Sequence, residues 1–206
     1  MNRIKKISIF LLITTIISSS LLISCSNDEN TSNNSDKLDL SKKVLKFDEI
    51  KLISQKVSKY QKEIVTKRID ARTAEEEMQE LLEPLVENGE DLHSEMITFL
   101  QENGEFDNMT LEEQNELMNL DEQQLAELSF VMSNAYDARI SIDPRIRACL
   151  SAAIGVTAIY DLISNTAALG TVETTIGALR LIGRRYLGWI GVGLMIMDFA
   201  DCYYGN

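Results

Sequence analysis

The stretch that decides the fold is residues 41–68, which read SKKVLKFDEIKLISQKVSKYQKEIVTKR. Its apolar side chains recur at intervals of three and four, at Val44, Leu45, Phe47, Ile50, Ile53, Val57, Tyr60, Ile64 and Val65. This spacing gathers them on one face of an α-helix, with lysines on the other face. The stretch therefore predicts an amphipathic helix. Its lysine face is either solvated or attracted to an anionic membrane or to the acidic segment that follows.

Residues downstream of this helix repeat the helical pattern in shorter, acidic pieces. Thr73 and Thr110 each open a Thr-x-x-Glu capping box, a signal for a helix start. The helices that we expect cover residues 73–82, 91–103, 110–118 and 121–138, with Pro84 and Asn88-Gly89 ending the first. Short amphipathic helices joined by Gly and Asn turns are typical of a helical domain.

The C-terminal region, residues 142–206, is apolar and holds eight of the ten glycines. We expect helices over 145–164, 172–184 and 186–203, and the best strand candidate, 171–175, is short. Residues 187–197 are apolar on all sides, which is typical of a helix in a core or a membrane, although the run is too short to span a bilayer. The small residues that could let helices approach closely are Ser151, Gly155, Gly188, Gly191 and Gly193. The fold class predicted is all-α, a bundle of short acidic helices with an apolar, glycine-rich C-terminal module.

Charge is spread unevenly along the chain. Without residues 1–24 the chain has 17 basic and 32 acidic residues, a net charge of −15. Residues 25–72 carry a net charge of +3, residues 73–141 carry −18, and residues 142–206 carry zero. A surface this acidic argues against nucleic acid as a partner.

The N-terminus has the layout of an export signal. Arg3, Lys5 and Lys6 precede an uncharged, mostly apolar run over residues 7–23. A membrane-spanning anchor is the alternative, but the run is short and diluted by Thr and Ser. It ends in Leu22-Ile23-Ser24-Cys25, which resembles the lipobox of bacterial lipoproteins. The resemblance implies that residues 1–24 are a signal peptide and that Cys25 is acylated and anchors the protein on a membrane.

The residues after Cys25 bear on the destination. Ser26 stands where lipoproteins kept at the inner membrane carry aspartate, and Ser26-Asn27-Asp28-Glu29-Asn30 resembles the export signal of surface lipoproteins of Bacteroidota. The resemblance implies an outer-membrane location, facing either the cell surface, which we favour, or the periplasm. Residues 25–40 are then a polar, disordered tether that leads into an acidic helical region, 41–141, and the C-terminal module, 142–206.

Two cysteines remain once Cys25 is lipidated. Export would bring Cys149 and Cys202 into an oxidising compartment, where a disulfide between them is expected. The alternative is two separate buried thiols, because cysteine is often fully buried. The spacing of the cysteines is not that of a metal site.

No constellation of residues predicts catalysis. His93 is the only histidine, and no nucleophile stands in a recognisable context for it. Asp161, Asp198 and Asp201 are flanked by apolar residues and would suit acid–base chemistry. A simpler expectation is that they pair with arginines, at Arg180, Arg184 and Arg185. Phosphate loops, zinc motifs and calcium loops are absent from the sequence, so we expect neither metal nor cofactor.

The function expected from the sequence is a non-enzymatic interaction or envelope role at the outer membrane. Its partners would be the membrane, through the lipid on Cys25, and a protein. The C-terminal region, however, loosely resembles the hydrophobic glycine-rich C-termini of bacteriocin-like peptides and small pore formers. That resemblance implies an alternative, a membrane-active factor in which residues 142–206 are the effector. An enzyme with an unrecognised site is a third reading.

Overall fold

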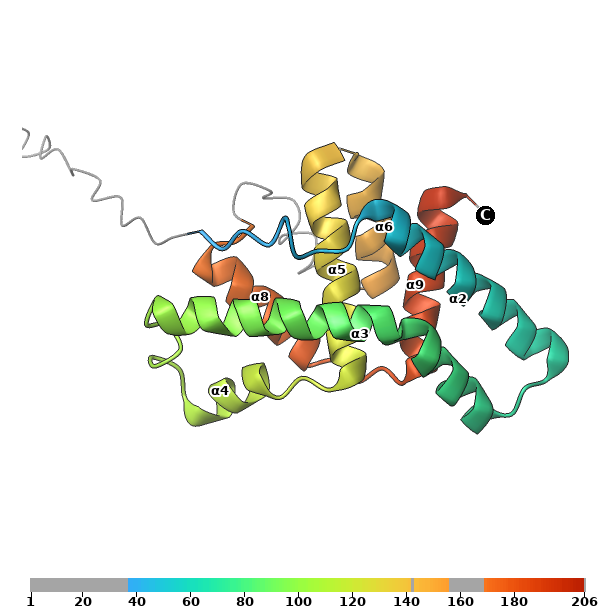
Figure 1. Cartoon of the computed structure of the whole chain (residues 1–206), viewed down its shortest axis with the longest axis horizontal. Coiled ribbons are helices and arrows are strands. Elements are labelled where there is room, and N and C mark those ends of the chain that lie inside the picture. The colour runs from blue at the N-terminus through green and yellow to red at the C-terminus, as the bar shows by residue number, and fades with distance from the viewer. Residues whose placement is uncertain (1–36, 142, 156–168, 206) are drawn as a thin grey trace, which may run out of the picture. The chain divides into compact units, whose positions relative to one another are not determined.

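The computed structural model describes residues 37–141, 143–155 and 169–205. The predicted signal peptide, Cys25, most of the tether and Asp161 lie outside these ranges. The helices are α2 (Phe47–Lys67), α3 (Ala71–Glu102), α4 (Leu111–Met118), α5 (Glu122–Ser141), α6 (Pro144–Ile154), α8 (Val172–Gly183) and α9 (Trp189–Tyr204) (Figure 1). Since the described residues contain helices and no strand, the prediction of an all-α fold is confirmed.

Several helix ends follow the capping signals in the sequence. The Thr110 hydroxyl accepts from the Glu113 backbone N–H, and the Glu113 carboxylate accepts from the Thr110 N–H, so this capping box forms as predicted. Asp121 caps α5 by accepting from the Gln124 N–H at 2.8 Å. Asp143 caps α6, and Pro144 occupies the first helical position, where no N–H is needed. These side chains satisfy backbone donors that have no partner within their helices.

The long helix α3 corrects the prediction of two separate helices. It runs unbroken over 32 residues, and Asp70 rather than Thr73 caps it, by accepting from the Thr73 N–H at 3.1 Å. Pro84 lies inside the helix, and Figure 1 shows that α3 bends along its length. A proline removes one backbone hydrogen bond and crowds the preceding turn, which bends a helix without always ending it.

Gly89, predicted to be a helix end, is instead the place where α5 crosses α3. A Cβ atom at Gly89 would lie 2.1 Å from the carbonyl oxygen of Leu125, so any larger residue would collide with the α5 backbone. On both sides of this glycine α3 buries leucines and methionines, among them Leu85, Leu92 and Met96. Burial of this apolar face outweighs the low helix propensity of one glycine.

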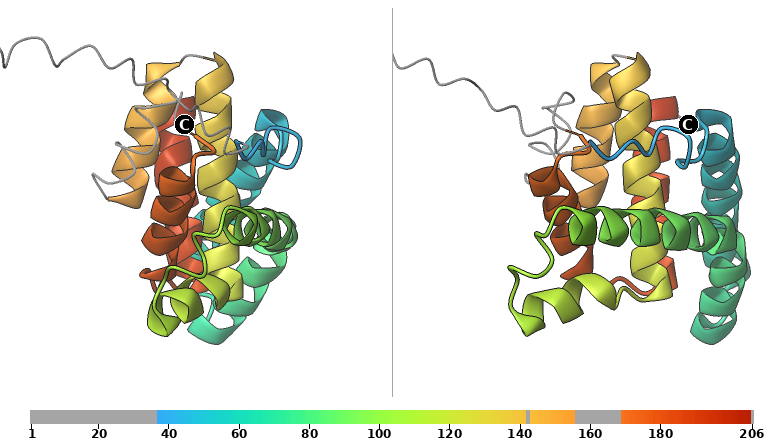
Figure 2. Two further views of the ribbon diagram at one scale, coloured as in Figure 1. Left: turned by 90° about the vertical axis from the view of Figure 1, so that its left-hand side faces the viewer. Right: turned by 60° about the vertical axis from the view of Figure 1, so that its left-hand side comes forward.

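Helix α9 buries one side in the core of the helical body and exposes Leu194, Asp198 and Asp201 on the other. It packs between α2 on one side and α5 and α6 on the other, and α3 crosses it (Figures 1 and 2). Val192, Ile196 and Phe199 are fully buried in one hydrophobic cluster that also draws on the acidic region. The division of the chain into four parts was predicted from composition. Helices on both sides of residue 142 share this core, so the division stays a prediction. No helix in the described ranges has the length and apolar character needed to cross a bilayer.

The C-terminal end of α6 differs from the prediction in one respect. It ends at Ile154, where Gly155 adopts a left-handed conformation with φ of +69° as the cap; residues 156–164 of the predicted helix lie outside the described part. Among the described residues, a Cβ at Gly155 would meet nothing within 4 Å, so Gly155 makes no close contact with a described helix. Gly193 does, because a Cβ there would lie 2.8 Å from the Met78 sulfur.

Cys149 and Cys202 lie at disulfide distance, as the sequence predicts. Their sulfur atoms are 1.96 Å apart and their Cα atoms 5.5 Å apart. The pair joins the middle of α6 to the last turn of α9.

Candidate functional site

A groove lies between α2 and α3 and has a volume of about 550 Å³. It is lined by Lys56, Lys59, Tyr60, Glu63, Glu77, Glu80 and Leu81. Lysines come from the α2 wall and most of the carboxylates from the α3 wall. The groove is therefore a charged surface in which positive and negative side chains both face the solvent.

A tight connection between the two helices forms this groove. Arg68 ends α2 in a left-handed conformation with φ of 53°, and its N–H donates to the Ile64 carbonyl oxygen. Asp70 then caps α3, so the chain reverses within three residues. Residues three or four apart share a face of a helix, which brings the two lysines together on α2 and Glu77 and Glu80 together on α3.

Tyr60 is the buried residue of the groove. Its side chain is only 8% exposed, and burial, followed by the neighbouring Glu77 carboxylate, raises the pKa of Tyr60 to about 12. The hydroxyl lies beside Glu77 without an aligned hydrogen bond to any atom of the described residues. Tyr60 therefore keeps its proton at neutral pH and can donate a hydrogen bond, but it cannot act as a base.

Glu63, on the α2 side of the groove, pairs with two lysines of its own helix, of which Lys59 lines the groove. Glu63 receives Lys67 at 2.7 Å and Lys59 at 4.0 Å, and Lys67 lowers the pKa of Glu63. Exposed pairs of this kind contribute little to stability. The ammonium groups remain accessible, so the groove can bind charged groups, and it lacks the nucleophile–base pair that a covalent reaction would need.

The two helices that form the groove have opposite charge. Helix α2 contains five basic and three acidic residues, whereas α3 contains ten acidic residues and one basic residue, Arg72. Glu76, Glu80, Glu83 and Glu87 are exposed on α3. The candidate site is this charge-divided pair of helices, with the groove at its centre.

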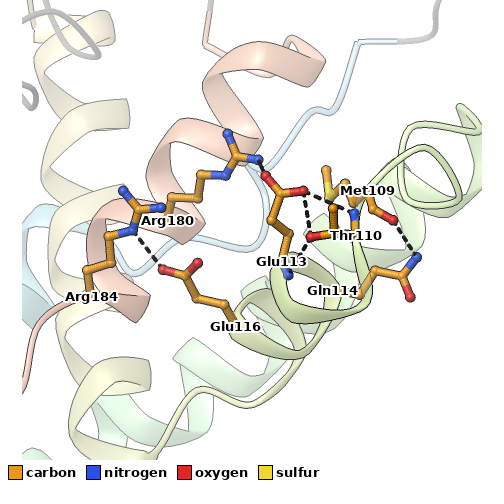
Figure 3. A network of polar contacts seen from close by, with 7 residues as sticks. All are labelled: Met109, Thr110, Glu113, Gln114, Glu116, Arg180 and Arg184. Carbon is orange, nitrogen blue, oxygen red and sulfur yellow. Dashed lines mark hydrogen bonds and ion pairs between the residues drawn. The ribbon is translucent and has the colours of Figure 1, made fainter.

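Three ion pairs that the sequence did not predict connect α4 and α5 with the segment around α8. Arg180 lies 2.6 Å from Glu113, and Arg184 lies 2.8 Å from Glu116 (Figure 3). The Thr110 backbone N–H and hydroxyl, and then the charge of Arg180, lower the pKa of Glu113. The pairs join segments 67 and 68 residues apart in sequence.

The third pair, between Glu127 and Arg185, is buried. The two side chains are 1% and 17% exposed, and Oε1 of Glu127 lies 2.5 Å from Nε of Arg185, an ion pair rather than an aligned hydrogen bond. Burial raises the pKa of Glu127 to about 7, although the charge of Arg185 lowers it. Arg185 also donates to the Ile154 carbonyl oxygen at 2.6 Å. Gln124, one turn before Glu127, donates to the carbonyl oxygens of Gly183 and Arg185. This polar cluster fixes the end of α8 to α5.

These contacts correct the expected arginine partners. Arg180, Arg184 and Arg185 each pair with a glutamate, and the prediction that they pair with aspartates of the C-terminal region is wrong for Asp198 and Asp201, which are exposed on α9. Asp161 is not described. One feature of the sequence could have indicated the buried pair, because Glu127 lies in an otherwise apolar stretch of α5. No feature of the sequence identified Arg185 as its partner.

His93 has a structural contact. Its Nε2 donates to the carbonyl oxygen of Leu117 at 2.6 Å and so joins α3 to the end of α4. Within the three described ranges, the His, Cys, Asp and Glu side chains form no cluster that could hold a metal ion.

Comparisons with known proteins identify no relative. No protein-family model, curated protein or solved structure matches the chain. The function is therefore argued from its own residues.

Proposed function

We propose that the chain is a lipid-anchored lipoprotein of the outer membrane with a non-enzymatic interaction role. The observation that carries the proposal is Leu22-Ile23-Ser24-Cys25 at the end of an uncharged run of export-signal length. Acylation of Cys25 by two or more chains would hold the protein stably on the membrane.

The length of the segment after Cys25 supports this arrangement. Residues 25–36 are polar apart from Cys25, and twelve residues reach at most about 40 Å when extended. The helical body that begins at residue 37 would therefore stay close to the bilayer. The string Ser26-Asn27-Asp28-Glu29-Asn30 supports display on the outer face of the outer membrane, where the body could meet other molecules.

The charge-divided pair of helices supports binding rather than catalysis. Its groove offers ammonium groups from Lys56 and Lys59 and carboxylates from Glu77 and Glu80. The one buried polar group among them, Tyr60, retains its proton at neutral pH. Such a surface recognises a partner by charge, and the partner class that we propose is a protein that binds the carboxylates on the α3 side.

Protease shaving of intact cells tests the anchor and the location together. We expect external protease to degrade the wild-type protein, and we expect Cys25→Ala protein to leave the membrane fraction. Ser24→Ala, which keeps a small residue before the cysteine, is the matched control and should behave as wild type. Cys25→Ala protein that stays in the membrane fraction would refute the lipid anchor, and wild-type protein resistant to shaving would refute surface display.

A further inference from the structure

The exposed side of α2 forms a basic surface, which we call the lysine face. It consists of Lys51, Leu52, Lys56, Lys59, Lys62 and Val65, all of them exposed. Leu52 and Val65 are 53% and 77% exposed, so this surface also presents apolar side chains to the solvent. Lys42 and Lys46, just before α2, are exposed as well.

Helical geometry explains why these side chains share a surface. At 100° per residue, Lys51, Lys59 and Lys62 fall within about a quarter of the helix circumference, with Leu52 and Lys56 beside them. The opposite side of α2 carries buried residues such as Ile53 and Val57, which contact the core. Figure 1 shows α2 at one edge of the helical body, so this surface faces outward.

The charge of the lysine face is not neutralised by the acidic helix beside it. In the part of the chain that the structure describes, the ion pairs of α2 lysines run to Glu63 of the same helix, and none reaches a carboxylate of α3. Lys51 lies over the Tyr204 ring, 5.6 Å from its centroid. Lys43, just before α2, does reach the downstream acidic segment, at 3.5 Å from Glu95 of α3, but among the described residues no lysine of α2 itself does so.

We propose that the lysine face lies against an anionic membrane surface, with the acidic exposed side of α3 turned toward the aqueous phase. The inference rests on the lipid anchor proposed above, because the twelve residues 25–36 keep a membrane within reach. An anionic surface attracts the lysine face and repels α3, so charge selects which side of the body meets the lipid. Lysines interspersed with exposed apolar side chains are also the pattern of helices that lie in the headgroup region.

The overall negative charge of the protein does not oppose this orientation. At physiological ionic strength the Debye length is about 8 Å, so acidic residues on distant faces are screened from the membrane. Each lysine held near an anionic surface strengthens binding about fivefold. Lys51, Lys59 and Lys62 together would therefore contribute about 100-fold.

Co-sedimentation with vesicles tests the proposal. The probe is the exported chain from residue 25 onward with Cys25→Ser, mixed at physiological ionic strength with vesicles of phosphatidylcholine containing either no or about one-third phosphatidylglycerol. We expect binding to the anionic vesicles, loss of that binding at high salt, and at least a tenfold weakening in the triple variant Lys51→Gln, Lys59→Gln, Lys62→Gln. Thermal unfolding monitored by circular dichroism establishes that the variant is folded.

The matched control removes the same charge elsewhere. Arg72→Gln, Arg145→Gln and Arg184→Gln together change three exposed residues on other segments and should weaken binding less than threefold. Equal losses in both triple variants, equal binding to both kinds of vesicle, or no binding by the parent chain would overturn the proposal. Binding of the lysine face to an acidic protein instead of lipid would give the last of these outcomes. A negative result in the vesicle test would leave the proposal of a lipid anchor standing. The anchor is tested separately, by the location of Cys25→Ala protein in cells.

Discussion

The acidic region, residues 73–141, and the C-terminal region, from residue 143 onward, reach the same core in different ways. The acidic region carries a net charge of −18, and its long helix α3 is amphipathic, with carboxylates outside and an apolar stripe inside. The C-terminal region has no net charge, and its last helix, α9, packs one side against α2, α3, α5 and α6 and exposes Leu194, Asp198 and Asp201 on the other side. A largely apolar helix can therefore pack into a bundle whose other helices carry most of the charge.

Arginines and glutamates join the two regions. Each of the three pairs takes its carboxylate from α4 or α5 and its guanidinium from α8 or the residues just after it. A membrane-active role for residues 142–206 would require α9 to leave the core and these pairs to separate. That alternative stays a prediction, and it fails if neither the isolated C-terminal region nor the whole chain permeabilises liposomes.

The largest expected effect comes from breaking the crossing of the two regions at α3 and α5. Gly89→Leu places side-chain atoms where the Leu125 carbonyl lies, because even a Cβ would be 2.1 Å from that oxygen. We expect a loss of about 4 kcal/mol or more in the free energy of unfolding, measured by urea denaturation. Glu90→Leu, at the next and exposed position, is the control and should change stability little. Normal stability of Gly89→Leu would mean that α5 does not cross α3 here.

Removing the cross-link between α6 and α9 comes next. Cys149 and Cys202 are 53 residues apart, and closing a loop of that length stabilises a protein by about 4 kcal/mol in the chain-entropy treatment. Cys149→Ala with Cys202→Ala should therefore lower the free energy of unfolding by about this amount. Reduced wild-type protein is the control and should match the double variant. Alkylation of both thiols in protein purified without reductant would contradict the disulfide.

The buried pair between the regions should make stability depend on pH. The pKa of Glu127 is about 7 in the folded protein and 4.5 ordinarily, so between these values the folded state holds a proton that the unfolded state has released. Stability therefore falls as the pH rises from about 4.5 to about 7, by about 3 kcal/mol.

The variant Glu127→Gln should lose this component. Its free energy of unfolding relative to wild type, followed by urea denaturation between pH 4.5 and pH 8, should rise across the window. Glu112→Gln removes one exposed carboxylate and serves as the control. A constant difference between wild type and Glu127→Gln across this range would show that Glu127 does not titrate there.

The smallest effect is expected at the exposed connection between the regions. Arg184 and Glu116 have side chains that are 66% and 25% exposed. Exposed ion pairs contribute little to the free energy of unfolding, because water solvates the separated charges almost as well. Arg184→Ala should lower the melting temperature by no more than about 1 °C, measured by calorimetry. A large decrease would mean that the network of Figure 3 holds the two regions together, and that the buried pair of Glu127 and Arg185 is not the main ionic contact.

Much of the fold was predictable because it is encoded locally. Apolar spacing over residues 47–67 and the caps at Thr110, Asp121 and Asp143 indicate helices regardless of what surrounds them. The prediction of a break at Gly89 was wrong because local propensity amounts to about 1 kcal/mol, less than the burial of the α3 stripe on both sides of it. The partners of the arginines could not be predicted, because the paired residues are far apart in sequence, 67 and 68 residues for Arg180 and Arg184. Many other carboxylates of the acidic region could equally have been the partners.

The sequence by itself determined the helical class, most helix starts and the uneven charge, because apolar period, capping chemistry and composition are local properties. It predicted the pairing of Cys149 with Cys202 on the assumption that Cys25 is lipidated, with two separate buried thiols as the alternative. It is also the sole source of the proposed anchor at Cys25. The tertiary structure alone decided that α3 runs unbroken past Gly89, that Glu127 is buried against Arg185, and that α9 lies in a protein core. These depend on which surfaces meet, and only packing of the whole chain determines that.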